Sequence, residues 1–172
     1  MRVLLTFFAI AFLNFISLSQ TFNGGGGNVP ASTITPTCFN INVTGIGAIN
    51  TTTQGLASVC LNITHPDVGD LEITLTAPDG TMVPLSIQNG GTGNNYTNTC
   101  FTATATNSIK VGTAPYTGSF LPEGWLGAVN NGQNANGTWR LCIRDRRAAS
   151  SGSLVNWSLT FNNTPAPMPP PT

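Results

Sequence analysis

Short runs of alternating apolar and polar residues cover much of the chain between residues 37 and 162. A period of two places one side of a strand in a core and the other in water. No ten-residue stretch there has the apolar spacing of an amphipathic helix, and turn sequences such as Pro78-Asp79-Gly80 separate the runs. The pattern predicts an all-β domain over 37–162, a jelly-roll-like β-sandwich. The clearest alternating runs are 59–64, 71–76, 139–144 and 154–161.

The two ends of the chain have a different composition. An apolar run over 3–16 follows Arg2 and precedes small residues, which predicts a signal peptide over 1–19, cleaved before Gln20. The run Gly24–Gly27 and the prolines that follow predict a flexible, exposed linker over 20–36. Five prolines predict an extended, unpacked tail over 163–172. The mature protein is therefore expected to be secreted or to lie at the cell surface.

Charge and cysteine content narrow the possible functions. Charged residues make up 7% of the chain and the formal net charge is zero, which argues against a nucleic-acid partner and against a polybasic membrane patch. Four cysteines in an exported chain predict two disulfides rather than a zinc site, because their spacing is wide. Three pairings are open. We favour Cys38–Cys60 with Cys100–Cys142.

Catalytic chemistry has little support in the sequence. His65 is the only histidine, and no Gly-x-Ser-x-Gly segment accompanies it. Its position at a strand end, before a proline, favours a turn or packing role. Glu72 and Glu123 are the only glutamates and the only candidates for a glutamate pair of a glycosidase, but the expected outward direction of Glu72 argues against this role. No catalytic residue is therefore predicted.

Calcium is a more plausible ligand, because it binds carboxylate and backbone oxygens in loops. Asp67, Asp70 and Asp145 are the candidate ligands, and turn-capping by the same aspartates is the alternative. The charged run Arg144–Arg147 predicts a solvated loop, with a partner contact or a site for a trypsin-like protease as the functional alternatives. Seven Asn-x-Ser/Thr sequons are acceptors only in a host that glycosylates asparagine.

The order and spacing of several short motifs over about 55–161 resemble the P domain, or Homo B domain, of subtilisin-like proprotein convertases and secreted bacterial proteins. Each motif is weak alone, whereas their combination is specific. The motifs include Gly69-Asp70-Leu71-Glu72-Ile73-Thr74-Leu75, Pro78-x-Gly80-Thr81, Asn95-Tyr96-Thr97-Asn98-Thr99, Pro122-Glu123-Gly124, Asn136-Gly137-Thr138-Trp139-x-Leu141 and Gly152-x-Leu154.

The resemblance implies a jelly-roll sandwich that stabilises a neighbouring protease domain and carries no catalytic triad. We therefore expect a non-catalytic, protease-associated module. The family is associated with serine endopeptidases, but the resemblance implies no such activity for this chain itself. The expected partner is a protein, either a subtilisin-like protease or missing domains of a longer chain. Relatives often carry acidic residues where this chain has 101–104 and 149–152, so the resemblance implies a weaker calcium site that keeps Asp70 and Asp145.

A surface adhesion or carbohydrate-binding module is the alternative function. Four aromatic residues in segments expected to be loops would form its sugar-stacking patch, and burial of all four would exclude it. These residues are Tyr96, Tyr116, Phe120 and Trp125.

Overall fold

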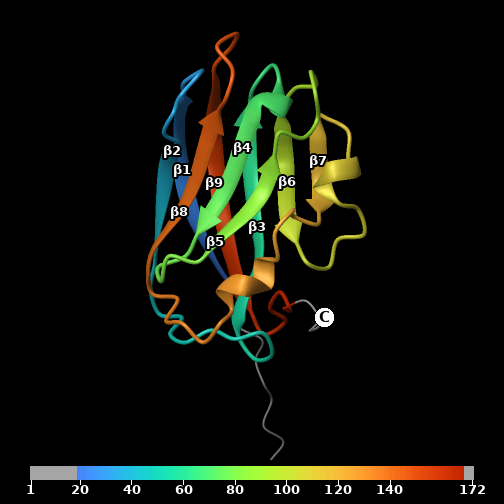
Figure 1. Ribbon diagram of the computed structural model, residues 1–172. Helices are drawn as coiled ribbons and strands as arrows, with labels where there is room; N and C mark the ends of the chain where they lie inside the picture. The colour runs from blue at the N-terminus through green and yellow to red at the C-terminus, as the bar shows by residue number, and fades with distance from the viewer. Residues whose placement is uncertain (1–18, 169–172) are drawn as a thin grey trace, which may run out of the picture.

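The computed structural model describes residues 19–168 and shows two β-sheets packed face to face (Figure 1). The predicted all-β sandwich is confirmed. No helix among the described residues is long and apolar enough to cross a membrane. Short 3-10 helices occur in three connections: η1 (Val68–Asp70), η2 (Ile109–Val111) and η3 (Leu126–Val129). The strands are β1 (Gln20–Val29), β2 (Thr37–Val43), β3 (Gly55–Thr64), β4 (Leu71–Thr76), β5 (Met82–Ile87), β6 (Tyr96–Thr102), β7 (Tyr116–Phe120), β8 (Gly137–Asp145) and β9 (Gly152–Asn162).

The strands form a five-stranded sheet in the order β1-β9-β3-β6-β7 and a four-stranded sheet in the order β2-β8-β4-β5. All neighbouring strands are antiparallel except β6 and β7, which are parallel. β8 and β9 follow each other in sequence but belong to different sheets. The connections therefore cross repeatedly between the sheets, and residues far apart in sequence meet at the ends of the sandwich.

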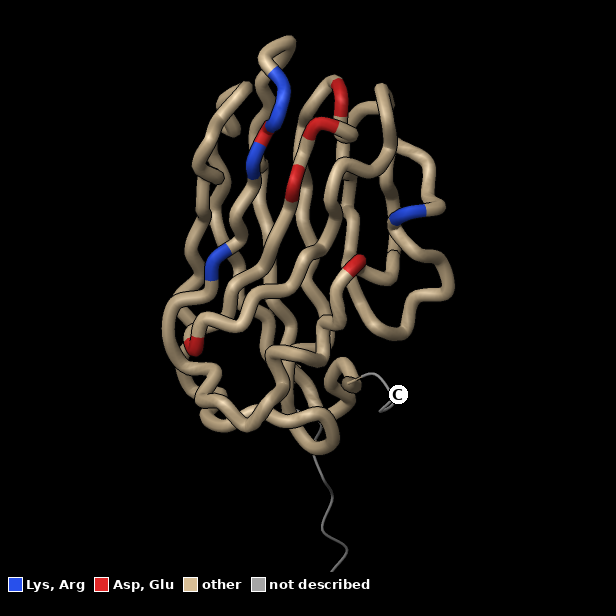
Figure 2. Tube along the Cα trace, in the orientation of Figure 1, with Lys and Arg blue, Asp and Glu red and all other residues tan. Residues whose placement is uncertain are grey.

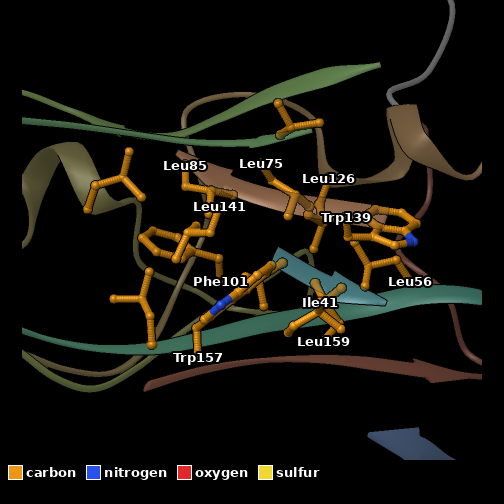
Figure 3. Close-up of a cluster of buried hydrophobic side chains, with 14 of the residues drawn as sticks. Ile41, Leu56, Leu75, Leu85, Phe101, Leu126, Trp139, Leu141, Trp157 and Leu159 are labelled. Carbon is orange, nitrogen blue, oxygen red and sulfur yellow. The ribbon is translucent and has the colours of Figure 1, made fainter. Parts of the chain in front are cut away.

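The core lies between the two sheets and is filled by the inward-facing residues of the alternating runs (Figure 3). Leu71, Ile73 and Leu75 of β4 are fully buried, as their spacing predicts. Trp139 on β8 packs edge-on against Phe161 on β9, with ring centroids 5.5 Å apart, so the largest side chains join the two sheets. Burying each such side chain contributes about 1.5–3 kcal/mol.

The prediction of a flexible linker over 20–36 is wrong for its first ten residues. Gln20–Val29 form β1, which pairs along nearly its whole length with β9. Glycine is required there because the strand lies very close to its neighbours. A Cβ atom on Gly24 would collide with the Trp157 ring, and one on Gly26 would collide with the Leu154 carbonyl. Gly24 and Gly26 are therefore needed for close packing at a sheet edge, whereas a Cβ atom on Gly25 would face open space.

The predicted disulfide pairing is also wrong. The bonds are Cys38–Cys142 and Cys60–Cys100. Each bond joins directly opposite residues of neighbouring antiparallel strands, β2 with β8 and β3 with β6. The pairing follows the strand order, which the spacing of the cysteines along the chain does not reveal. Both bonds nevertheless support the predicted two-disulfide framework.

The tail is not fully unpacked, contrary to the prediction for 163–172. Ala166 is buried, and its amide donates to the Leu56 carbonyl at 2.9 Å. The buried Asn130 side chain donates to the carbonyls of both residues and accepts from the Leu56 amide at 2.8 Å. The packed domain therefore extends from β1 to at least Ala166. Residues 1–18, which hold nearly all of the predicted signal peptide, and 169–172 lie outside the described residues.

Candidate functional site

The corner between β3 and β4 brings together the only histidine and three aspartates of the chain. β3 ends just before His65, and η1 then leads into β4. β4 pairs with β8 so that Leu71 lies opposite Asp145, the last residue of β8. This register brings Asp145 to the corner although it is 80 residues from His65 in sequence. His65 Nε2 lies 3.0 Å from Asp145 Oδ2, and neither side chain is exposed.

Hydrogen bonds assign the proton on the His65 ring. The Asp67 amide donates to His65 Nδ1 at 3.1 Å, so Nδ1 is the acceptor and Nε2 carries the hydrogen that it donates to Asp145. The second oxygen of Asp145, Oδ1, accepts from the Arg147 amide at 2.9 Å. The arrangement is a linear chain of three donors and three acceptors, and it satisfies every one of them.

Both nitrogens of the His65 ring are thus occupied by the surrounding backbone and the buried carboxylate. A general base needs a ring nitrogen that faces the proton it removes. One side of the ring is closed as well, because a Cβ atom on Gly152 would collide with His65 Cδ2 and the Thr64 carbonyl. The glycine of the Gly-x-Leu motif is therefore needed where β9 begins beside this ring. The pair joins the ends of β3 and β8 and holds the loop that follows β8.

The three aspartates predicted to bind calcium do not gather around one point. Asp145 faces His65, while Asp70 lies 3.4 Å from the Arg147 guanidinium. Asp67 and Asp70 line the same depression, together with Gln88 and Arg147. Within 19–168 no group of three or more His, Cys, Asp or Glu side chains is arranged to hold a metal ion. Calcium binding by Asp67 and Asp70 with backbone oxygens stays a prediction.

The Arg144–Arg147 run is not simply a solvated loop, because its side chains pair with β4 and the corner. Glu72 Oε1 lies 2.8 Å from Arg146, and Glu72 Oε2 lies 3.7 Å from Arg144. Arg144 Nε also donates to the Thr33 carbonyl at 3.0 Å. Figure 2 shows acidic and basic segments side by side at this end of β4 and β8. The charges therefore largely neutralise one another locally.

Glu123 has a structural role that sequence reasoning missed. Its Oε1 accepts from the Ile87 amide at 2.7 Å and from Asn89 Nδ2 at 2.6 Å, and its Oε2 lies 3.4 Å from Lys110. It holds the end of β5 and the loop toward β6. Its position in the Pro-Glu-Gly motif was visible, but a motif alone does not name the backbone amide that its carboxylate meets.

Three of the four aromatic residues considered for sugar binding are in the core. Tyr96 stacks on Tyr116 with centroids 4.9 Å apart, and Tyr116 meets Phe120 edge-on at 5.4 Å. Burial raises the pKa of the Tyr96 phenol well above its ordinary 10.0. Trp125 alone of the four is open to solvent, with 60% of its surface exposed. The sugar-stacking patch of four aromatics is therefore not formed.

Trp125 lies at the rim of a pocket of about 210 Å³. The pocket is formed where the segment after β7 passes η3 and the C-terminal segment, and its lining is mostly apolar. Lys110 pairs with Glu123 at one side of it, so η2 lies beside the same segment. The lining residues are Ala103, Ser108, Leu121, Pro122, Glu123, Gly124, Trp125, Leu126 and Pro167.

Comparisons with known proteins agree with this fold. The chain is 30% identical over 135 residues to leupeptin-inactivating enzyme 1 of Streptomyces exfoliatus. The matched segment covers 78% of this chain and 24% of the relative. Two crystal structures of the serine protease of Aeromonas sobria are similar at 19% identity. The protease alone gives a TM-score of 0.50 and its complex with the chaperone ORF2 gives 0.52. Each match covers 86% of this chain and 27% of the protease chain.

The chain thus spans about a quarter of the length of these relatives. A family model described as the proprotein convertase P-domain matches residues 56–161, from the start of β3 to the end of the core segment of β9. The matched region contains the His65–Asp145 pair, Glu123 and Gly152 and ends just short of the buried Ala166. On this match, the chain belongs to the proprotein convertase P-domain family.

Proposed function

We propose that this protein is a secreted, non-catalytic P-domain module that stabilises or binds another protein, with a subtilisin-like protease as the partner class. The match to the P-domain family over 56–161 carries this proposal. It is supported by the similarity to a region of two longer proteins, one of which is a serine protease. The partner could be a separate protein or a further part of the same polypeptide.

The occupied ring of His65 supports a non-catalytic role. A histidine-dependent serine or cysteine nucleophile would need Nδ1 or Nε2, and both are hydrogen-bonded within the corner. The four cysteines are paired in disulfides, which leaves no free thiol in the described chain. Glu72 and Glu123 are each held by ion pairs and hydrogen bonds, as expected for structural carboxylates.

The two disulfides support an extracellular location, because such bonds persist in oxidising compartments. The predicted signal peptide over 1–19 would deliver the chain there. Export also fits the low content of charged residues, since solubility then depends on Asn, Thr and Ser on the strand faces.

The pocket beside Trp125 is the surface we assign to the protein partner. An exposed tryptophan at a mostly apolar depression has the character of an interface anchor. Val111 of η2, whose Lys110 pairs with Glu123 of the pocket, is a second exposed apolar residue, with 78% of its surface open. A partner side chain could fill the pocket while covering Trp125.

A serine-hydrolase probe tests the absence of catalysis. The purified chain is treated with a fluorophosphonate and examined by intact mass, and is assayed on peptide and ester substrates beside a His65→Ala variant. We expect no probe adduct and no turnover. Labelling or hydrolysis that disappears in the variant would contradict the non-catalytic role.

A chimaera tests the association with a protease. This chain replaces the matching region of leupeptin-inactivating enzyme 1, and the thermal inactivation of the chimaera is compared with that of the enzyme lacking this region. We expect the chimaera to inactivate more slowly, and Trp125→Ala to reverse the gain. Val155→Ala, an exposed apolar residue on β9 that does not line the pocket, is the matched control. A chimaera no more stable than the shortened enzyme would argue against the stabilising role.

A further inference from the structure

The loop between β8 and β9 carries two adjacent arginines at one extreme end of the sandwich. Arg146 and Arg147 follow the last residue of β8, and their side chains are 42% and 71% exposed. Figure 1 shows this connection projecting at the end opposite η3 and the C-terminal end of the described chain. Ala148 and Ala149, which come next, are exposed as well.

The backbone changes character at the Arg147–Ala148 bond. On the N-terminal side, the Arg146 amide donates to the Asp70 carbonyl at 3.0 Å and the Arg147 carbonyl accepts from the Ser32 amide at 2.9 Å. On the C-terminal side, no backbone hydrogen bond joins 148–151 to any other residue of the described chain, and pairing resumes only at Gly152. The bond after Arg147 therefore joins an arginine held by backbone hydrogen bonds to four residues that make none in the described chain.

The other basic residues of the described chain are held more firmly. Arg140 lies within β8, where the backbone pairs with β2 on one side and with β4 on the other. Arg144 is paired with β4 and is half-buried. Lys110 belongs to η2, where the following two amides bond back to the preceding turn. Endopeptidases cut exposed, locally unfolded segments far faster than paired strands.

We propose that the Arg147–Ala148 bond is a site of limited proteolysis by endopeptidases that cleave after basic residues. Water adds across this peptide bond, so that Arg147 gains a carboxylate and Ala148 gains an amino terminus. The substrate requirement is an arginine at the cleaved bond and an open chain after it. This inference rests on the loop alone and is independent of the proposed function.

Cleavage there has an unusual consequence for the domain. Both disulfides lie on the N-terminal side of the bond, so no covalent link connects β9 to the remainder after the cut. β9 stays paired with β1 and β3 along its length. Its Trp157, Leu159 and Phe161 side chains stay buried between the sheets. The product is a two-chain sandwich in which a central strand is held without a covalent bond.

Limited digestion of the purified full chain tests the proposal. Trypsin is compared with a lysine-specific endopeptidase, and the products are identified by intact mass and N-terminal sequencing. We expect trypsin to cut first between Arg147 and Ala148, giving a fragment that begins at Ala148, while the lysine-specific enzyme leaves the folded chain intact. Non-reducing denaturing gels should separate the two fragments, and native gel filtration should keep them together.

Two variants complete the experiment. The Arg146→Gln/Arg147→Gln double variant should lose the early cut, whereas Arg140→Gln should be cut like the parent. Melting curves of all three proteins show whether a change in cutting reflects unfolding instead, since a less stable protein would be cut faster. A first cut at Lys110 or Arg140, an unchanged early cut in the double variant, or fragments that part on native gel filtration would overturn the proposal.

Discussion

Replacing Asp145 by asparagine should destabilise the domain although the two side chains have the same shape. In the parent, the Asp67 amide, the His65 ring and the Arg147 amide supply three donors, and the acceptors are His65 Nδ1 and the two Asp145 oxygens. Asparagine provides one oxygen and one amino group at the same place. If the oxygen faces His65, the amino group faces the Arg147 amide, so two donors meet.

No alternative arrangement removes this conflict. If the asparagine is flipped, its amino group faces the ring, and His65 must move its hydrogen from Nε2 to Nδ1. Nδ1 then meets the Asp67 amide donor instead. Every arrangement leaves one buried donor without a partner, which costs about 1–3 kcal/mol. For a domain of this size, a loss of about 2 kcal/mol lowers the melting temperature by roughly 4–8 °C.

Urea and thermal denaturation of the parent, Asp145→Asn and Asp67→Asn measure this loss. Asp67 occupies the same corner, but its carboxylate makes no ion pair in the described chain, so its variant serves as the control. The nitrogen-15 shifts of His65 should report a hydrogen on Nε2 in the parent. Equal midpoints for the two variants, or a hydrogen on Nδ1 in the parent, would refute the argument.

The other predictions concern the strand pairs, the tail, the buried tyrosine and calcium. Replacing the β3–β6 disulfide by alanines should lower the free energy of unfolding by about 4 kcal/mol, and replacing the β2–β8 disulfide by about 5 kcal/mol, because the bonds close loops with sequence separations of 40 and 104 residues. Peptide mapping checks the pairing, and urea unfolding measures the losses. Asn130→Ala should cost about 2–4 kcal/mol because it removes three buried hydrogen bonds; a cost near zero, with unchanged amide exchange in the tail, would contradict this. Because burial raises the pKa of Tyr96, the folded state keeps its phenolic hydrogen at alkaline pH values at which the unfolded state has lost it. The stability that Tyr96 contributes is therefore complete below pH 10.0 and is lost as the pH rises beyond it. Urea midpoints should fall in alkali, and they should fall less in Tyr96→Phe. Calcium, if bound, should raise the melting temperature and EDTA should lower it, and no shift with intact disulfides would count against the ion.

Local pattern predicted the strands well because alternation reports which face of a strand is buried. Leu71, Ile73 and Leu75 are core residues in the structure for that reason. Composition misled the prediction for the glycine run, which is a strand and not a flexible linker. Gly24 and Gly26 lack side chains because a neighbouring strand occupies that space. Composition alone cannot distinguish a glycine that permits motion from one that permits contact.

The site could not be predicted because its parts meet only through strand order. The sequence favours a turn or packing role for His65 and makes Asp145 a candidate calcium ligand, but it does not connect the two residues. Their pairing depends on β4 lying beside β8, which brings the start of one strand to the end of the other. The disulfides depend on the same non-local order. Neither the register nor the sheet order can be read from the spacing of residues along the chain.

The placement of charge explains what kind of recognition such a module can support. None of the five strands of the β1-β9-β3-β6-β7 sheet contains Asp, Glu, Lys or Arg, whereas the charged residues of the described chain lie on the other sheet and in loops (Figure 2). Several of these charges are neutralised in local ion pairs, such as those of Glu72 and Glu123. Long-range attraction of a charged partner is therefore weak, and association should proceed at the unsteered rate of about 10⁵–10⁶ M⁻¹s⁻¹ with little dependence on salt. Affinity for the proposed protein partner would then come from shape and apolar contact, for which the exposed Trp125 and its pocket are the surface we propose.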